Sequence, residues 1–433
     1  MPVYKKRHHG LLKKLWLICI NSPTITNKNH YKKSRIKIAL SIFLLIILGL
    51  SIFLYCSWEI PLISPLTDNS WLVFSSEEKG SIFNLFSNKN PKIVYGFLPY
   101  WNLDTVTVQP ELTHLSYFGL NIQEDGSIVT KDADGNTHPG YRKLYSDNLL
   151  NLANFVHDNN NGQLEITLVQ FEADIINKIV NNPEAHDNLI NSIDALLLSA
   201  PVSGINIDIE YGGTVTSELR DNFALMIEKI RQHLETKFDK VTLSIDMYAS
   251  ASNNKQIWDV PRIAHAVDYL VVMAYDFHRR GSPQAGPVAP LFGGKDKWDT
   301  DIHQHLREYL RYVPKEKILL GIPFYGYGWQ TESHSPQSNS FPDTGFTATY
   351  SFVQSLFTNS EVSNIITGWD DTALCPYISY EKEGNIYMIY YENKTSISYK
   401  VEYVKQLDLA GVAIWAIGYE KDSRELWDVI AKM

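Results

Sequence analysis

Two carboxylates lie two residues apart in the stretch Gly204-Ile205-Asn206-Ile207-Asp208-Ile209-Glu210-Tyr211. Isoleucines alternate there with polar residues, and a period of two predicts a β-strand with the isoleucines on one face and the polar side chains on the other. Asp208 and Glu210 would then stand roughly 6–7 Å apart on one face, close enough for each to shift the pKa of the other. Paired acids on a buried strand are typical of acid–base catalysis. The alternative is a solvent-exposed edge strand with one polar face.

Short apolar segments alternate with helical patterns from about residue 91 onwards, and the clearest helical pattern covers residues 217–234. Eight such segments predict an α/β fold, a closed (β/α)8 TIM barrel with parallel strands. An open doubly wound sheet is the alternative, but no Gly-rich phosphate loop follows the first strand. The predicted strands are residues 93–98, 114–120, 165–169, 204–209, 240–246, 269–275, 318–323 and 411–417.

Two stretches interrupt this rhythm. After the second strand, the dipeptides Asp125-Gly126 and Asp134-Gly135 predict hairpin turns and hence a small β-decoration. Residues 132–136 have only part of the ligand spacing of a calcium loop, so we interpret them as a plain turn. A small α+β insertion is predicted between strands seven and eight, at about residues 327–405, where it would wall one side of a cleft.

The C-terminal ends of barrel strands meet at one face, which is where such barrels place their active sites. In this chain those ends carry an acid pair, a tyrosine hydroxyl and several aromatic rings. Such a set indicates a sugar-binding cleft, because rings stack on the apolar faces of pyranoses while carboxylates and amides bind the hydroxyls. For Met273 and Trp415 the alternative is packing in the core. The residues are Tyr100, Trp101, Asn206, Asp208, Glu210, Met273, Tyr275, Asp276, Tyr325 and Trp415.

Four ordered motifs make the chain from about residue 92 to the end resemble the family 18 glycoside hydrolases, the chitinase-type family, and among them membrane-anchored bacterial members. The fourth strand of that family reads Asp-x-x-Asp-x-Asp-x-Glu, and residues 203–210 match its last two acids. The other three motifs follow in the expected order. They are Met273-Ala274-Tyr275-Asp276, the stretch of residues 321–329 and Gly411-Val412-Ala413-Ile414-Trp415.

The resemblance implies a retaining hydrolysis in which the substrate, not the enzyme, supplies the nucleophile. Glu210 would be the general acid and later the general base. Asp208 would hold the acetamide N–H and stabilise the oxazolinium ion, and Tyr275 would bind the acetamide oxygen. No cofactor and no metal are implied. The expected substrate-binding residues are Trp415 on the floor of the −1 subsite, Tyr325, Met273 and Asp276 on its walls, and Trp101.

The sequence departs from the family pattern at three places. Asn206 stands where the family usually has an acid that shares a proton with its neighbour. Its amide can donate permanently to Asp208, so we count Asn206 among the catalytic residues and expect a simpler pH profile. Ser203 replaces the first acid of the motif. The third strand, within residues 165–170, lacks the family's Ser-x-Gly-Gly, so substrate contacts there would differ.

The N-terminal part differs from the rest in charge. Residues 1–37 hold ten Lys or Arg and no Asp or Glu, which predicts a cytoplasmic tail. Residues 38–57 are uncharged and long enough to cross a bilayer, so we expect a single-pass membrane anchor with the catalytic domain outside the cell. A cleaved signal peptide is the alternative. Residues 58–90 would form a linker, and residues 91–433 the catalytic domain.

Residues 58–433 contain 29 basic and 48 acidic side chains, a formal charge of −19. This balance argues against nucleic-acid binding by phosphate neutralisation and fits neutral polyol ligands. The chain has three cysteines, one of them in this part, so no disulfide framework is possible within it. We expect a monomer that contacts its membrane and its glycan.

Two hypotheses follow. The first is a membrane-anchored glycosidase that hydrolyses β-1,4 linkages of N-acetylglucosamine in chitin-type oligomers or in the peptidoglycan of a bacterial wall. The second is a catalytically silent, lectin-like barrel, a type that usually loses the acid equivalent to Glu210. That acid is present here.

Overall fold

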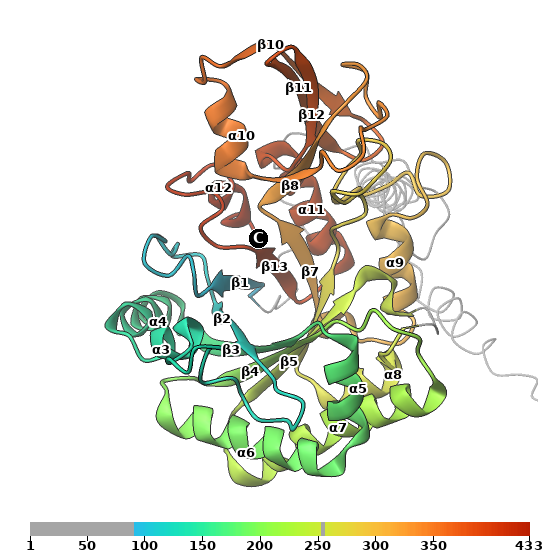
Figure 1. Ribbon diagram of the computed structural model, residues 1–433. Coiled ribbons are helices and arrows are strands. Elements are labelled where there is room, and N and C mark those ends of the chain that lie inside the picture. The colour runs from blue at the N-terminus through green and yellow to red at the C-terminus, as the bar shows by residue number, and fades with distance from the viewer. Residues whose placement is uncertain (1–90, 253–255) are drawn as a thin grey trace, which may run out of the picture. The chain divides into compact units, whose positions relative to one another are not determined.

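Eight parallel strands close into a barrel in the computed structural model, which describes residues 91–252 and 256–433. Strands that follow one another along the chain pair side by side, and β13 closes the barrel between β1 and β7. This confirms the predicted (β/α)8 architecture (Figure 1). The barrel strands are β1 (Ile93–Pro99), β2 (His114–Asn121), β3 (Gln163–Gln170), β4 (Gly204–Ile209), β5 (Thr242–Tyr248), β6 (Tyr269–Met273), β7 (Ile318–Pro323) and β13 (Gly411–Trp415).

Helices follow most of the barrel strands. The predicted helix at residues 217–234 is α7 (Ser217–Lys237), where the Thr216 hydroxyl caps the helix by accepting the backbone N–H of Leu219 at 3.1 Å. Its buried apolar residues recur every three or four positions and pack between α5 and α8. The helices outside the insertion are α3 (Pro139–Leu144), α4 (Asp147–Asn160), α5 (Ala173–Asn181), α6 (Pro183–Ser199), α7, α8 (Val260–Ala266), α9 (Ile302–Tyr309), α11 (Lys394–Leu407) and α12 (Trp427–Ile430).

The alternation of β4 divides its side chains as the sequence predicts. Ile205, Ile207 and Ile209 are inaccessible to solvent. Asn206 and Asp208 lie on the other face and are also buried, which rules out the alternative of a solvent-exposed edge strand. The barrel therefore holds polar side chains in its interior.

Hydrogen bonds across the barrel define one interior layer beneath the cleft. The Tyr95 hydroxyl of β1 donates to the Glu165 carboxylate of β3 at 2.7 Å, and the Ser244 hydroxyl of β5 donates to the same oxygen at 2.8 Å. These residues come from alternate strands, which is how inward-pointing side chains of such barrels form layers. Glu165 is fully buried, and burial raises its pKa to about 7.

A five-stranded antiparallel sheet is inserted between β7 and β13, at the top of Figure 1, and its strand order is β10-β11-β12-β8-β9. The predicted insertion at about residues 327–405 covers this sheet except for its first two residues. That range also takes in most of α11, which contacts the barrel strands β7 and β13 as well as β11 of the inserted sheet. The inserted elements are β8 (Tyr325–Gln330), β9 (Phe346–Thr349), α10 (Tyr350–Leu356), β10 (Val362–Asp370), β11 (Cys375–Lys382) and β12 (Asn385–Tyr390).

The β-decoration after β2 is confirmed. Ile122 bridges to Ile128 and Lys131 bridges to Thr137, with the predicted Asp-Gly turns between them. Both turn glycines have positive φ, 86° at Gly126 and 82° at the second turn. The carboxylate of Asp132 accepts two backbone N–H groups of its own loop, as expected of a plain turn.

The predicted tail, membrane anchor and linker, residues 1–37, 38–57 and 58–90, lie outside the described residues. Within the part of the chain that the structure describes, no helix combines the length and apolarity needed to cross a membrane.

Candidate active site

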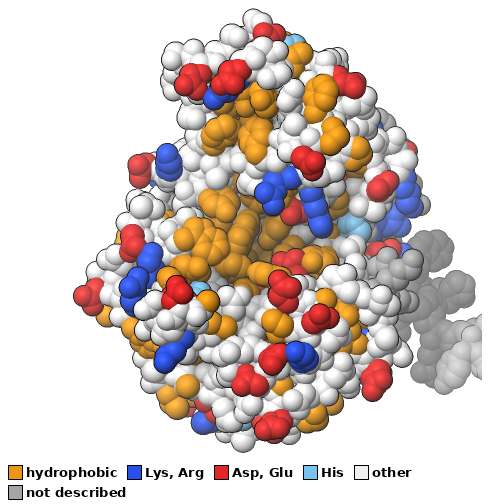
Figure 2. Space-filling view, viewed as in Figure 1, with side chains coloured by type: hydrophobic (Ala, Val, Ile, Leu, Met, Phe, Trp, Pro, Cys, Tyr) orange, Lys and Arg blue, Asp and Glu red, His pale blue; other side chains and the backbone are white. Residues whose placement is uncertain are grey.

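A cleft of about 750 Å³ opens at the C-terminal ends of the barrel strands. Figure 2 shows it as a hollow lined largely by hydrophobic side chains, with acidic and basic groups around it. The structure brings all the predicted site residues except Tyr100 and Asn206 to the wall of this cleft. They are Trp101, Asp208, Glu210, Met273, Tyr275, Asp276, Tyr325 and Trp415.

Glu210 comes directly after the last residue of β4, so its side chain reaches into the cleft while its backbone remains tied to the barrel. Burial raises the pKa of Glu210, and the negative charge of Asp276 raises it further. A hydrogen bond from the Tyr248 hydroxyl and the positive charge of Arg279 act in the opposite direction. A carboxyl group with a raised pKa keeps its proton closer to neutral pH, as a general acid requires.

Asp208 lies deeper, with 4% of its surface exposed. Its Oδ1 atom has no hydrogen-bond partner among the described residues. Burial raises its pKa well above the usual value, and repulsion by the carboxylates of Asp246 and Glu210 adds to the effect. A buried carboxylate oxygen without a donor is costly, and a ligand N–H could satisfy it.

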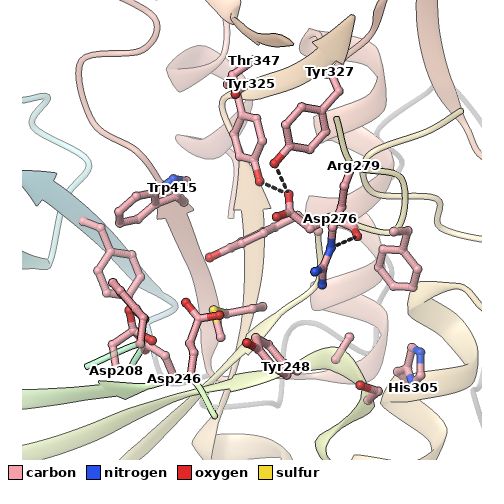
Figure 3. A pocket seen from close by; sticks show the side chains of 18 of the residues that line it. Asp208, Asp246, Tyr248, Asp276, Arg279, His305, Tyr325, Tyr327, Thr347 and Trp415 are labelled. Atoms are coloured by element: carbon pink, nitrogen blue, oxygen red, sulfur yellow. Dashed lines mark hydrogen bonds between the residues drawn. The ribbon is translucent and has the colours of Figure 1, made fainter. Parts of the chain in front are cut away.

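Asp246 is a third acid at this site, and the sequence interpretation missed it. Ile207 of β4 pairs with Ile245 of β5, so Asp208 and Asp246 follow one step later on neighbouring strands. Figure 3 shows the two carboxylates next to each other. Asp246 is 3% exposed, and burial raises its pKa well above the usual value. Ser244, Asp246 and Tyr248 alternate with apolar residues just as on β4, and that pattern could have revealed the second polar strand.

Asn206 does not donate to Asp208, so that prediction is wrong. Its Nδ2 group donates to the Ser244 hydroxyl at 3.0 Å and to Asp246 Oδ1 at 2.9 Å, and both hydrogens are thereby used. The physical reason is the register, which sets Asn206 opposite Ser244 and directs the amide towards β5. Asn206 therefore lies beneath the cleft wall and supports Asp246. Because Asp246 supplies a second buried carboxylate beside Asp208, the reason for expecting a simpler pH profile no longer holds.

The segment after β6 brings Tyr275 and Asp276 to the cleft. Three residues after the end of β6, the backbone of Asp276 is left-handed, with a φ of 63°, and its side chain meets the insertion. Its carboxylate accepts hydrogen bonds from the hydroxyl groups of Tyr325 and, at 3.0 Å, Tyr327 (Figure 3). Burial raises the pKa of Tyr275 well above its usual value, so its hydroxyl keeps its proton and remains a donor.

Aromatic rings form the floor and one rim of the cleft. Trp415 ends β13 and packs edge-on against Phe118, with ring centroids 4.5 Å apart. Trp101 also meets Phe118 edge-on and is 50% exposed, so one of its surfaces is free to stack on a sugar. The sequence interpretation missed Phe118, because it lies within β2 and not at the end of that strand, where site residues were expected.

Further cleft-lining residues were also missed. Phe171, at 47% exposure, and Tyr327 add aromatic surface, and Arg279 adds a positive charge. Arg279 belongs to the pair Arg279-Arg280 shortly after the Tyr-Asp motif, a signal that the sequence does carry. Within residues 91–252 and 256–433, no three His, Cys, Asp or Glu side chains are grouped so that they could hold a metal ion.

Comparison with known families gives a match to the glycosyl hydrolases family 18 over residues 85–420. The chain is 26% identical over 259 residues to Chitinase A1 of Niallia circulans, covering 54% of this chain and 37% of that protein. It is 22% identical over 333 residues to the cortical fragment-lytic enzyme of Bacillus anthracis, covering 72% of this chain and 66% of that protein. The chain spans about half the length of several of the curated relatives that it matches.

Among solved structures, the fold is similar to that of the Group IV chitinase of Ostrinia furnacalis in complex with allosamidin. The TM-score is 0.67 at 22% identity, over 79% of this chain and 98% of that one. At this identity the likeness shows the shared fold. The family match covers most of the chain, including all eight strands of the barrel.

Proposed function

The chain belongs to glycosyl hydrolase family 18 and is thus a chitinase-like glycoside hydrolase, and on that premise we propose that it cleaves β-1,4 linkages of N-acetylglucosamine with Glu210 as proton donor. The observation that carries the proposal is that one strand brings two acids to the cleft. Asp208 and Glu210 both reach the cleft from β4, and Tyr275 lines the same cleft.

In the first step the acetamide oxygen of the −1 sugar attacks the anomeric carbon of that sugar. The bond from that carbon to the glycosidic oxygen breaks, and Glu210 gives its proton to the leaving oxygen. An oxazolinium ion forms, so no enzyme nucleophile is required. Glu210, now a carboxylate, then takes a proton from a water molecule. The oxygen of that water bonds to the anomeric carbon while the bond from that carbon to the acetamide oxygen breaks, which opens the oxazolinium ring. The raised pKa of Glu210 suits both roles.

Asp208 and Tyr275 would orient the acetamide. The unpartnered Oδ1 of Asp208 would accept the acetamide N–H, and the Asp208 charge would stabilise the positive oxazolinium ion. The Tyr275 hydroxyl would donate to the acetamide oxygen. Trp415 would form the floor under the −1 sugar, with Tyr325, Met273 and Asp276 beside it and Trp101 at the rim.

Asp246 gives the chain its own version of the acid pair. Two adjacent buried carboxylates share a proton, because both cannot easily be charged. When Asp208 becomes an anion to bind the acetamide N–H, Asp246 would hold the shared proton. The Asn206 amide, fixed at 2.9 Å from Asp246 Oδ1, would keep that carboxyl in place. The family usually carries the second acid of this pair at the position of Asn206 on β4. In this chain Asp246 on β5 would take the role of that acid.

The polymer could be chitin-type or a bacterial wall glycan, since both contain N-acetylglucosamine. The similarity to a chitinase and to a cortical fragment-lytic enzyme is compatible with either. Mass spectrometry of products separates the two possibilities. The full-length chain in detergent would be incubated with chitooligosaccharides and, separately, with purified peptidoglycan.

We expect saccharides that end in N-acetylglucosamine from at least one of these substrates, and the product lengths would distinguish endo from exo cleavage. The control is Glu210→Gln, which should give no products. If the wild type binds the sugars yet releases nothing from either polymer, the proposed hydrolysis is refuted. The chain would then be the lectin-like barrel, an alternative that the presence of Glu210 in the cleft does not favour.

We further propose that residues 38–57 anchor the chain in the cell membrane, with residues 1–37 in the cytoplasm, the catalytic domain outside and a monomeric state. The support for the anchor and its orientation is the charge distribution and apolarity of residues 1–57. Protease treatment of intact cells should remove the catalytic domain and spare the tail. Resistance of the whole chain would contradict this topology.

A further inference from the structure

Arg279 is a cleft residue that the proposed chemistry leaves without a role. It lies three residues after Asp276, in the segment that follows β6, and its side chain lines the cleft. Its Nε group donates to the backbone carbonyl of Asp276 at 3.2 Å, which fixes one edge of the guanidinium. Figure 3 shows the remaining nitrogens turned away from this bond, towards the side of the cleft that holds Tyr248.

Arg279 has no acidic partner within the described residues. The nearest acid in the sequence, Asp276, accepts hydrogen bonds from Tyr325 and Tyr327 instead. Several other arginines among the described residues are paired, as Arg262 is with both oxygens of Glu228. The guanidinium of Arg279 therefore keeps donors available for a ligand in the cleft.

The charge of Arg279 acts near the site of bond cleavage. Burial raises the pKa of Glu210, and the positive charge of Arg279 lowers it. Burial likewise raises the pKa of Tyr248, with Arg279 again acting in the opposite direction. Arg279, Glu210 and Tyr248 also line the same cleft, so a sugar bound beside Glu210 would share that cleft with the guanidinium.

The surroundings of Arg279 do not attract anions in general. Residues 58–433 carry a formal charge of −19, and the cleft itself contains several carboxylates. Long-range repulsion of an anionic polymer is screened beyond about 8 Å at physiological salt, whereas a direct contact is not. A single fixed cation in an acidic cleft therefore suits one anionic substituent at one position.

We propose that Arg279 binds a carboxylate carried by the glycan, so that the chain cleaves strands containing muramic-acid-type sugars in preference to neutral chitin-type oligomers. A guanidinium matches a carboxylate with two parallel N–H donors. The carboxylate has two possible sources, the lactyl group on the sugar itself or the peptide attached to it. This inference rests on the proposed function, because it names the polymer on which that hydrolysis acts.

The test compares kcat/KM of the full-length chain on three substrates. Peptide-free glycan strands present the lactyl carboxylate, peptide-bearing strands present only the carboxylates of the peptides, and chitooligosaccharides present none. The variants are Arg279→Gln, Arg279→Lys and the matched control Arg280→Gln. Arg280 is the neighbouring arginine, which is exposed like Arg279 but does not line the cleft.

For Arg279→Gln we expect the ratio of kcat/KM on carboxylated strands to kcat/KM on chitooligosaccharides to fall about ten- to hundredfold, the effect of losing a hydrogen bond to a charged group. Arg279→Lys should keep part of the ratio, and Arg280→Gln all of it. A loss confined to peptide-free strands identifies the lactyl carboxylate as the ligand, and a loss confined to peptide-bearing strands identifies the peptide. An equal loss on neutral and carboxylated substrates, or an equal effect of the two Gln variants, overturns the proposal.

A binding measurement separates this proposal from the hydrolysis itself. On a Glu210→Gln background, titration calorimetry with the same strands reports Kd without turnover. Adding Arg279→Gln should weaken binding of carboxylated strands by a similar factor relative to chitooligosaccharides. This result would stand even if the wild type released no product, and an unchanged ratio of Kd values would refute the role of Arg279.

Discussion

Two regions of this chain bury carboxylates, and they do so in opposite ways. Beside the insertion, Glu392 is paired with Lys400 of α11 at 2.8 Å, and both side chains are inaccessible to solvent. Inside the barrel, Asp208 and Asp246 stand on neighbouring strands with no cation paired to either among the described residues. Opposite charges offset each other's desolvation, whereas like charges add to it. The opposite-charge pair therefore stabilises the fold. The like-charge pair destabilises it, and we attribute its presence to its role in the active site.

The largest expected effect comes from replacing Glu210, the acid that lies in the cleft near Asp208 and Asp246. Glu210→Gln should lower kcat/KM by about 100- to 10,000-fold, the usual contribution of a general acid. The thermal midpoint should stay the same or rise, because one raised-pKa acid is removed from the barrel. Kinetics on whichever substrate yields products would measure this. Retained activity would show that another group donates the proton.

Breaking the opposite-charge pair should do the reverse, with stability lost and catalysis spared. Lys400→Met leaves Glu392 charged and buried, at a cost of about 3–5 kcal/mol. The midpoint of urea denaturation would report the loss. The matched control is Lys405→Met on the same helix, where an exposed ion pair with Glu402 contributes less than about 1 kcal/mol. Equal effects of the two variants would mean that burial does not distinguish these pairs.

Replacing Glu165 tests how strongly a buried acid without a cationic partner makes the stability of the barrel depend on pH. Its pKa in the folded state is about 7, above its usual value, so its contribution is fully present below about pH 4.5 and is lost as pH rises through 7. Glu165→Gln should remove up to about 3 kcal/mol of this dependence. Denaturation at a series of pH values measures it, with the exposed Glu235→Gln as control. Parallel curves for wild type and Glu165→Gln would contradict the assignment.

The smallest expected effect is a shift in the pH profile, and it tests directly whether the two buried acids of the barrel, Asp208 and Asp246, interact. Burial and the charge of Asp246 raise the pKa of Asp208, so Asp246→Asn should let Asp208 ionise at lower pH. The acidic limb of the kcat/KM profile should move down by roughly one pH unit. The double variant Asn206→Asp with Asp246→Asn returns the second acid to β4 and should restore the limb. A limb that does not move in Asp246→Asn would show that the two acids are not coupled.

The barrel could be predicted from sequence because its strands are short, mostly apolar segments separated by helical patterns. The acids of β4 could be placed for the same reason. The partner of Asn206 could not, since it depends on the register between β4 and β5, which sets the amide against Asp246. Local sequence does not encode which residue stands opposite on the next strand.

The insertion was the hardest part of the fold to predict. Its strand β10 (Val362–Asp370) has a single buried residue, and its pairing with β11 shifts between Ser363 and Ile366. That shift breaks the alternation by which strands are recognised. Tyr327 and Arg279 were missed for a related reason, because they reach the cleft through the placement of the inserted sheet and of the segment after β6.

The central claim is that the substrate's acetamide replaces an enzyme nucleophile while Glu210 handles the proton. Proton NMR of the reaction mixture, recorded before the products mutarotate, tests it most directly. The account predicts that the new reducing end appears first as the β-anomer with wild-type chain, that Glu210→Gln forms none, and that oligomers lacking the N-acetyl group at the −1 sugar are not cleaved. Appearance of the α-anomer first, or cleavage of the de-N-acetylated oligomer at a comparable rate, would contradict it.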